Sequence, residues 1–147
     1  MQSKTYSVGT LGTYKYVVVL SRFQGKILLS RHRARSTWET QGGHVEPGET
    51  PLDAAKRELY EESGAAEYAL VPLCDYRAWD ENTGKGATGM VFAADIRKIG
   101  DMPESEMAEV RAFDVLPPNV TYPAITPELF ARLEQMGGFD KIFGGGK

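Results

Sequence analysis

One strongly signalled helix lies between two groups of predicted strands. Thr50 is suited to cap a helix whose first residue is Pro51, a position at which proline is favoured. Gly64 is suited to end the same helix, because glycine adopts the left-handed conformation without steric cost. These signals predict a helix over roughly residues 51–62, fixed at both ends.

The sequence predicts further strands before and after this helix, and a second helix near the carboxyl end. Runs of β-branched and aromatic residues predict strands, and a second helix with a threonine cap is expected near the carboxyl end. The strands are expected at residues 14–23, 26–32, 68–79, 88–98 and 109–115, and the second helix at 126–136. The order of strands, helix, strands and helix predicts an α/β sandwich on a mixed sheet and argues against a doubly wound fold.

Length and composition exclude several classes of protein. With 147 residues, the chain is expected to be a single domain, 1–147, with a loose glycine-rich tail over roughly 137–147. One cysteine cannot form an internal disulfide, which argues against a disulfide-stapled secreted module. A net charge of −3 argues against a duplex nucleic-acid partner, and the short apolar runs predict no membrane partner. Without a targeting signal, the expected location is cytoplasmic.

Three glutamates gather on one face of the first predicted helix. Glu58, Glu61 and Glu62 are spaced i, i+3 and i+4, so their carboxylates lie side by side. Such repulsion calls for compensation, and a divalent cation with hard oxygen ligands supplies it. Arg57 and Glu49 are close enough in the chain to join this cluster. The alternative is a solvated acidic face, but the preceding glycine-rich loop favours binding of phosphate or a metal ion.

The same segment, Gly42–Ala65, resembles a known family motif. It is similar to the Nudix box, G-x5-E-x7-R-E-U-x-E-E-x-G-U with U an apolar residue. The matching positions are Gly43, Glu49, Arg57, Glu58, Leu59, Glu61, Glu62, Gly64 and Ala65. Only the last apolar position is weak, because it is an alanine.

The resemblance implies a Nudix-type α/β/α sandwich and a nucleotide pyrophosphohydrolase that needs Mg²⁺, with Mn²⁺ as a substitute. It places Glu58, Glu61 and Glu62 as metal ligands, with the Gly43 carbonyl beside them. Glu58 is the first candidate for the general base, so the expected catalytic residues are Glu58, Glu61 and Arg57. Arg57 is also expected to form a supporting ion pair with Glu49.

Family members often add a carboxylate from outside the box. Glu106 and Glu109 are the candidates for a further metal ligand, or for the general base in place of Glu58. For each of them an ordinary solvated acid is an equal alternative.

Substrate recognition is less constrained by the sequence. Arg31 resembles by position an arginine that contacts phosphate in MutT-like enzymes, and Asn119 resembles an asparagine that recognises a purine edge. Trp79 is the expected stacking surface for a base, with Trp38 and Phe113 as further candidates. The alternatives are a solvated edge strand for Arg31, a turn for Asn119 and core packing for the aromatic residues.

Departures from the family pattern also bear on the substrate. Many members place Leu-Pro before the glycine pair, where this chain has Thr40 and Gln41, and this change is expected to alter the floor of the pocket. The proline of the ADP-ribose subgroup and the tyrosine of the dinucleoside polyphosphate subgroup are replaced at residues 79–80 and 81–82. Both differences favour a nucleoside triphosphate.

The expected function is therefore Mg²⁺-dependent hydrolysis of a nucleoside triphosphate to a monophosphate and pyrophosphate, with oxidised guanine nucleotides as one candidate. One alternative is a pyrophosphatase for another nucleoside diphosphate derivative: a nucleotide sugar, a dinucleoside polyphosphate, ADP-ribose or a capped RNA end. Another is a catalytically silent module that binds nucleotide. The expected partner is a small nucleotide, and pairing into a homodimer is an expectation from relatives alone.

Overall fold

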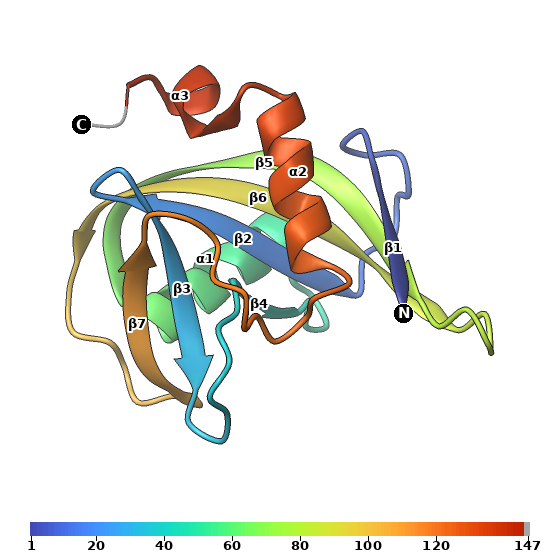
Figure 1. The fold of residues 1–147 in the computed structure, drawn as a ribbon, viewed down its shortest axis with the longest axis horizontal. Helices are drawn as coiled ribbons and strands as arrows, with labels where there is room; N and C mark the ends of the chain where they lie inside the picture. The colour runs from blue at the N-terminus through green and yellow to red at the C-terminus, as the bar shows by residue number, and fades with distance from the viewer. Residues whose placement is uncertain (146–147) are drawn as a thin grey trace.

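The computed structural model describes residues 1–145 and builds them around one mixed sheet (Figure 1). The strands are β1 (Gln2–Tyr6), β2 (Tyr16–Phe23), β3 (Lys26–His32), β4 (Gln41–His44), β5 (Ala65–Trp79), β6 (Gly86–Ile99) and β7 (Met107–Phe113). The helices are α1 (Pro51–Ser63), α2 (Thr126–Gln135) and α3 (Gly138–Phe143). Within residues 1–145, no helix combines the length and the hydropathy needed to cross a bilayer.

The sheet has seven strands in the order β1-β5-β6-β2-β3-β7, and β4 pairs with β2 outside this path. β2 and β6 run parallel at its centre, and the other pairs are antiparallel. The prediction of an α/β sandwich on a mixed sheet is confirmed.

Two apolar clusters cover the two faces of this sheet. Because successive side chains of a strand point to opposite faces, Val17 and Val19 of β2 pack with Leu59 of α1, whereas Leu20 packs with Leu129 of α2. Figure 1 shows α1 behind the sheet, with α2 and α3 on the opposite side. The three layers follow from this alternation, since each helix buries its apolar stripe against one face.

α1 begins and ends at the signals found in the sequence. The Thr50 hydroxyl accepts a hydrogen bond from the Asp53 N–H, and the Asp53 carboxylate accepts one from the Thr50 N–H. Gly64 ends the helix at φ 76°, where a side chain would be strained. The helix extends one residue beyond the predicted end, to Ser63.

Three elements were not predicted. β1 is a polar edge strand that is held by backbone pairing to β5, and β4 is a four-residue strand with two glycines. α3 lies in the segment expected to be a loose tail, because Phe139 and Phe143 pack against the α2-side cluster. The last two residues of that expected tail lie outside the described residues.

The start of α2 differs from the prediction as well. Thr126 is not the cap but the first helical residue, and it is 2% exposed. The cap position is taken by Ile125, whose side chain has no group able to bond the free N–H groups. The turn before α2 accounts for the difference, because the N–H groups of Ile125 and Thr126 already donate to the Tyr122 carbonyl and the helical conformation begins one residue earlier than predicted.

Candidate active site

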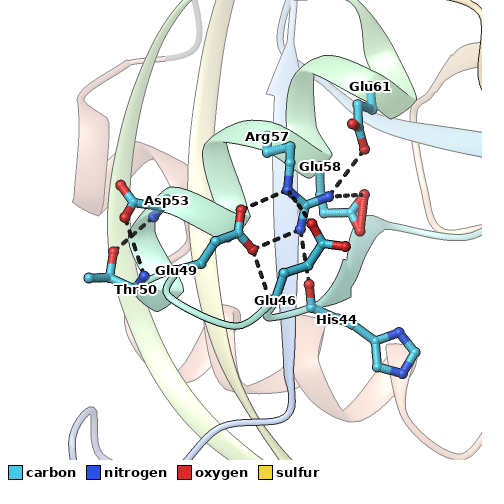
Figure 2. Close-up of polar contacts among 8 residues, drawn as sticks. All are labelled: His44, Glu46, Glu49, Thr50, Asp53, Arg57, Glu58 and Glu61. Atoms are coloured by element: carbon cyan, nitrogen blue, oxygen red, sulfur yellow. Dashed lines mark hydrogen bonds and ion pairs between the residues drawn. The ribbon is translucent and has the colours of Figure 1, made fainter.

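Arg57 is the centre of a polar network that joins α1 to the preceding loop (Figure 2). Its guanidinium donates two hydrogen bonds to the Glu49 carboxylate, at 2.7 and 2.9 Å, and one to the His44 carbonyl at 3.1 Å. The hydrogen bond from Arg57 lowers the pKa of Glu49 to about 2. The predicted ion pair under the loop is confirmed, and it fixes residues 44–49 against the helix.

The same guanidinium also faces the carboxylates of α1. Arg57 Nη1 lies 3.2 Å from Glu61 Oε1 and 3.5 Å from Glu58 Oε1. The Glu58 side chain is 13% exposed, whereas that of Glu61 is 45% exposed. Burial raises the pKa of Glu58 to about 7, although the charge of Arg57 opposes this shift. The site therefore contains a carboxyl group poised to hold or lose a proton near neutral pH.

Glu62 points away from Arg57, toward β4. Its Oε1 accepts a hydrogen bond from the Gly42 N–H at 2.9 Å. Burial raises the pKa of Glu62 to about 8, and the bond from Gly42 only partly offsets the effect of burial. A buried carboxylate without a cation is costly, so this position favours binding of positive charge.

Two glycines allow β4 to approach its neighbours this closely. A Cβ added to Gly42 would lie 2.3 Å from the Val17 carbonyl oxygen. A Cβ added to Gly43 would lie 1.7 Å from Glu58 Oε2. The contact at position 42 is with backbone, so glycine is required there. At position 43 a side chain would instead displace the Glu58 carboxylate from its place beside β4.

The donor set of this cluster fits a hard divalent cation. Glu58, Glu61 and Glu62 offer carboxylate oxygens, and Gly43 offers a backbone carbonyl beside Glu58. Across residues 1–145, no three acidic, histidine or cysteine side chains lie in an arrangement that could already bind a metal ion. Arg57 and the Gly42 N–H each bond one oxygen, Oε1, of Glu61 and Glu62, respectively, so each carboxylate can offer its other oxygen, Oε2, to a cation.

These carboxylates line a cleft of about 940 Å³ between α1, the sheet and the loops before β7 and α2. Three tyrosines, Tyr16, Tyr76 and Tyr122, line the same cleft. Tyr76 is buried, and burial raises its pKa, whereas Tyr122 is 47% exposed. Basic side chains are also present; they belong to Lys15, His32, Arg35 and Lys85. The cleft thus combines acidic, basic and aromatic groups, as a nucleotide requires.

The structure brings six of the predicted site residues to this cleft. They are Gly43, Arg57, Glu58, Glu61, Glu62 and Glu106. Glu106 is 83% exposed and lies 3.3 Å from His32 Nε2, on the segment before β7. Its roles as metal ligand or general base stay predictions.

Four other predicted residues lie outside the described lining of the cleft. Glu109 is paired with Arg31 at 3.4 Å and with Arg111 at 2.8 Å. Asn119 donates its amide to the Ser36 carbonyl at 3.3 Å, and Trp79 lies under the guanidinium of Arg77. Each of these four groups is thus occupied by a neighbour in the chain.

The sequence did not identify the tyrosines of the cleft. Tyr16, Val18 and Leu20 are alternate residues of β2, so their side chains lie on the same face of the sheet. This is the face that α2 covers. Nothing in the sequence indicates that this face opens into a cleft at Tyr16 and is closed at Leu20. Trp38 and Phe113, which were candidates, instead pack edge to face at 5.0 Å.

Comparison with known proteins agrees with this arrangement. The family model described as NUDIX domain matches residues 14–132. Over 85 residues, 58% of this chain, the sequence is 40% identical to the putative 8-oxo-dGTP diphosphatase YtkD of Bacillus subtilis strain 168. Over 63 residues, 43% of this chain, it is 36% identical to an RNA pyrophosphohydrolase of Francisella philomiragia. The matched stretches span 52% and 40% of these relatives, respectively.

A solved structure extends the similarity over almost the whole fold. A mutant of the Bacillus subtilis pyrophosphohydrolase BsRppH superposes with a TM-score of 0.78 and 28% sequence identity. The alignment covers 92% of this chain and 91% of that one. The similarity of fold therefore extends well beyond the matched motif.

Proposed function

This chain belongs to the NUDIX family, and on that premise we propose that it hydrolyses a nucleoside triphosphate to a monophosphate and pyrophosphate with Mg²⁺. The observation that carries the proposal is the set of α1 carboxylates at the cleft. Burial raises the pKa of two of them, Glu58 and Glu62. A protein that uses this helix only as a solvated acidic face would not bury Glu58 and Glu62 beside a cleft.

A divalent cation would be held by Glu58, Glu61, Glu62 and the Gly43 carbonyl; when bound, it neutralises phosphate charge and activates water. Arg57 holds the loop and helix together, so that these groups share one geometry. Arg35 and His32 line the cleft, where their side chains can donate hydrogen bonds to phosphate oxygens. Glu58 is also our candidate to accept a proton from the attacking water, because its largely buried carboxyl group lines the cleft.

The aromatic part of the cleft supports a nucleoside as the organic group. Tyr16, Tyr76 and Tyr122 line the cleft, and Tyr122 is the most exposed of the three. Base stacking on such rings contributes about 1–3 kcal/mol per base in nucleic-acid complexes. This contribution is tolerant of base identity, so the tyrosines support nucleotides as a class, among them oxidised guanine nucleotides.

The RNA 5′ end is the second candidate substrate. It is favoured by the fold-wide similarity to BsRppH, whose name describes a pyrophosphohydrolase, and by the related RNA pyrophosphohydrolase. The two candidates share the same reacting group, a phosphoanhydride next to a nucleoside.

A substrate panel separates these candidates. Purified protein with Mg²⁺ is offered ordinary and oxidised nucleoside triphosphates, 5′-triphosphate RNA, a nucleotide sugar and ADP-ribose, and released pyrophosphate and phosphate are measured. The proposal expects pyrophosphate from a nucleoside triphosphate at the highest kcat/KM. Turnover restricted to RNA ends favours the second candidate, and no turnover on the whole panel favours a silent binding module.

Replacing the α1 carboxylates tests the site itself. Glu58→Gln and Glu61→Gln each remove a charged ligand while keeping the shape, so kcat is expected to fall by about two orders of magnitude or more. Glu67→Gln is the matched control, because Glu67 is an exposed glutamate on β5 outside the cleft lining. Kinetics and circular dichroism are compared, and unchanged kcat in both α1 variants would remove these residues from catalysis.

A further inference from the structure

A buried chain of polar side chains connects the sheet to the last turn of α1. Ser21, Ser30 and Gln41 are each no more than 1% exposed. The Ser21 hydroxyl donates to Gln41 Oε1 at 2.7 Å, and Gln41 Nε2 donates to the Ser30 hydroxyl at 3.0 Å. The Ser30 hydroxyl in turn donates to the Glu62 carbonyl at 2.8 Å. Hydrogen bonds linked in this way strengthen one another in a low-dielectric interior.

The chain exists because two strands separate at this point. β2 pairs with β3 only from Ser21 to Phe23, and toward its start β2 pairs with β4 instead. The separation leaves the Leu28 carbonyl facing the gap, where Gln41 Nε2 donates to it at 3.3 Å. An apolar residue at position 41 would leave the carbonyl and both serine hydroxyls without this partner, so the amide is required by the geometry.

Glu62 is consequently held at two points. Its backbone carbonyl is bonded by Ser30, and its carboxylate is bonded by the N–H of Gly42, the residue after Gln41. Carbonyls in the last turn of a helix have no intrahelical donor, so the Ser30 hydroxyl is the group that fixes this turn to β3. β4 and β3 together determine where the end of α1 lies relative to Gly42 and Gly43.

We propose that Ser30 and Gln41 are positioning residues for the metal-binding end of α1. They hold the turn that carries Glu61 and Glu62 in register with Gly43, so that these groups meet one cation without reordering the helix end. The inference rests on the proposed function, because it explains how Glu61, Glu62 and Gly43 are placed to bind one cation. Gln41 also lines the cleft, whereas Ser30 lies outside its described lining, and in this role both residues act through Glu62.

The two serines form a matched pair for the test. Each is buried, and each is hydrogen-bonded to the Gln41 amide, but only Ser30 also contacts α1. Ser30→Ala and Ser21→Ala therefore remove one buried hydroxyl from the same chain. Both are expected to lower the melting temperature by a similar amount.

The variants should differ in their response to Mg²⁺. Losing a partner that orients a metal ligand typically weakens metal binding about 10- to 100-fold. In Ser30→Ala, the Mg²⁺ concentration for half-maximal rate is expected to rise about ten-fold, with little change in KM for substrate at saturating Mg²⁺. In Ser21→Ala, it is expected to stay within about two-fold of wild type, because that hydroxyl does not reach α1.

Two further measurements make the test independent of turnover. Mg²⁺ binding is followed by calorimetry without nucleotide, and amide hydrogen exchange is followed in the last turn of α1, which should be faster in Ser30→Ala and unchanged in Ser21→Ala. Gln41→Met keeps the side-chain length but not the amide, so it should behave like Ser30→Ala.

The outcomes separate the inference from the proposed function. If wild type hydrolyses nucleotide but the two serine variants shift alike in Mg²⁺ dependence, or neither shifts, the positioning role is wrong and the enzyme assignment stands. If wild type neither binds Mg²⁺ nor hydrolyses any substrate, the proposed function is wrong, and a role for Ser30 in metal binding is wrong with it.

Discussion

At the scale of single residues, the carboxyl groups of α1 and of the loop before it differ in how their surroundings shift their pKa values. The pKa of Glu58 is raised to about 7 and that of Glu62 to about 8, whereas the hydrogen bond from Arg57 lowers the pKa of Glu49 to about 2. The lowered pKa of Glu49 stabilises the fold above its unfolded value of 4.5, and this contribution is lost as pH falls toward 2. The raised pKa values of Glu58 and Glu62 have the opposite effect on the pH dependence of stability. They favour the folded state at pH below 4.5, and this advantage disappears as pH rises through 7 and 8.

Metal binding at these groups should therefore release protons. A cation that binds carboxylates has to displace the protons that Glu58 and Glu62 hold near neutral pH, so about one proton per protein is expected to leave at pH 7. Calorimetric titration with Mg²⁺ in two buffers of different ionisation enthalpy measures this number. Glu67→Gln is expected to leave it unchanged, and equal heats in both buffers would contradict the prediction.

At the scale of elements, the end of the described chain is held by one buried cation. Arg22 of β2 is 5% exposed and forms ion pairs with Asp95 of β6 at 3.0 Å and Asp140 of α3 at 2.8 Å. Its guanidinium also lies over the rings of Phe139 and Phe143, 5.9 Å from each ring centroid. A six-residue helix is not stable alone, so α3 depends on this contact with the sheet.

Removing that cation should release α3. Arg22→Met keeps the apolar stem but leaves Asp95 partly buried without its partner, so the free energy of unfolding is expected to fall by about 3 kcal/mol. Arg97→Met is the control, because Arg97 is 69% exposed and reaches Asp95 only at 4.0 Å; its effect should stay within about 0.5 kcal/mol. Denaturant unfolding and amide exchange over residues 138–143 measure both. Unchanged protection of α3 in Arg22→Met would show that apolar packing alone holds it.

At the scale of the whole molecule, the cleft is built by residues from many different elements. Its lining comes from strands β2 to β7, from α1 and α2, and from the segments that precede β7 and α2. A ligand that contacts all of them binds only the folded chain, so its binding free energy adds to stability.

Nucleotide and Mg²⁺ should therefore stabilise the protein together. At about 100 times the dissociation constant, a ligand adds about 2.7 kcal/mol, which corresponds to roughly 5–10 °C in melting temperature for a domain of this size. We expect this shift with a non-hydrolysable nucleoside triphosphate plus Mg²⁺, and a smaller one with either alone. Tyr122→Ala should reduce the shift, and Glu67→Gln should not. If the melting temperature of Tyr122→Ala rises as much as that of wild type, the base binds elsewhere in the cleft.

The sequence by itself determined the local features of this protein. The capped α1, the i, i+3 and i+4 spacing of its glutamates, and the pairing of Arg57 with Glu49 all depend on residues within about 20 positions of one another. Helical geometry fixes such relations before any tertiary contact forms. The family resemblance was carried by the same short segment, and the match to residues 14–132 confirmed it.

Only the tertiary structure decided which distant groups share the cleft. It left Arg31, Glu109, Asn119 and Trp79 bound to neighbours outside the cleft lining, and it brought Tyr16, Tyr76 and Tyr122 into it. Strands β1 and β4 and helix α3 likewise depend on partners far along the chain, because their own residues carry weak local preferences. The amide of Gln41 has a place in the interior only because β2 and β3 separate, and a separation between strands has no signature in a linear sequence.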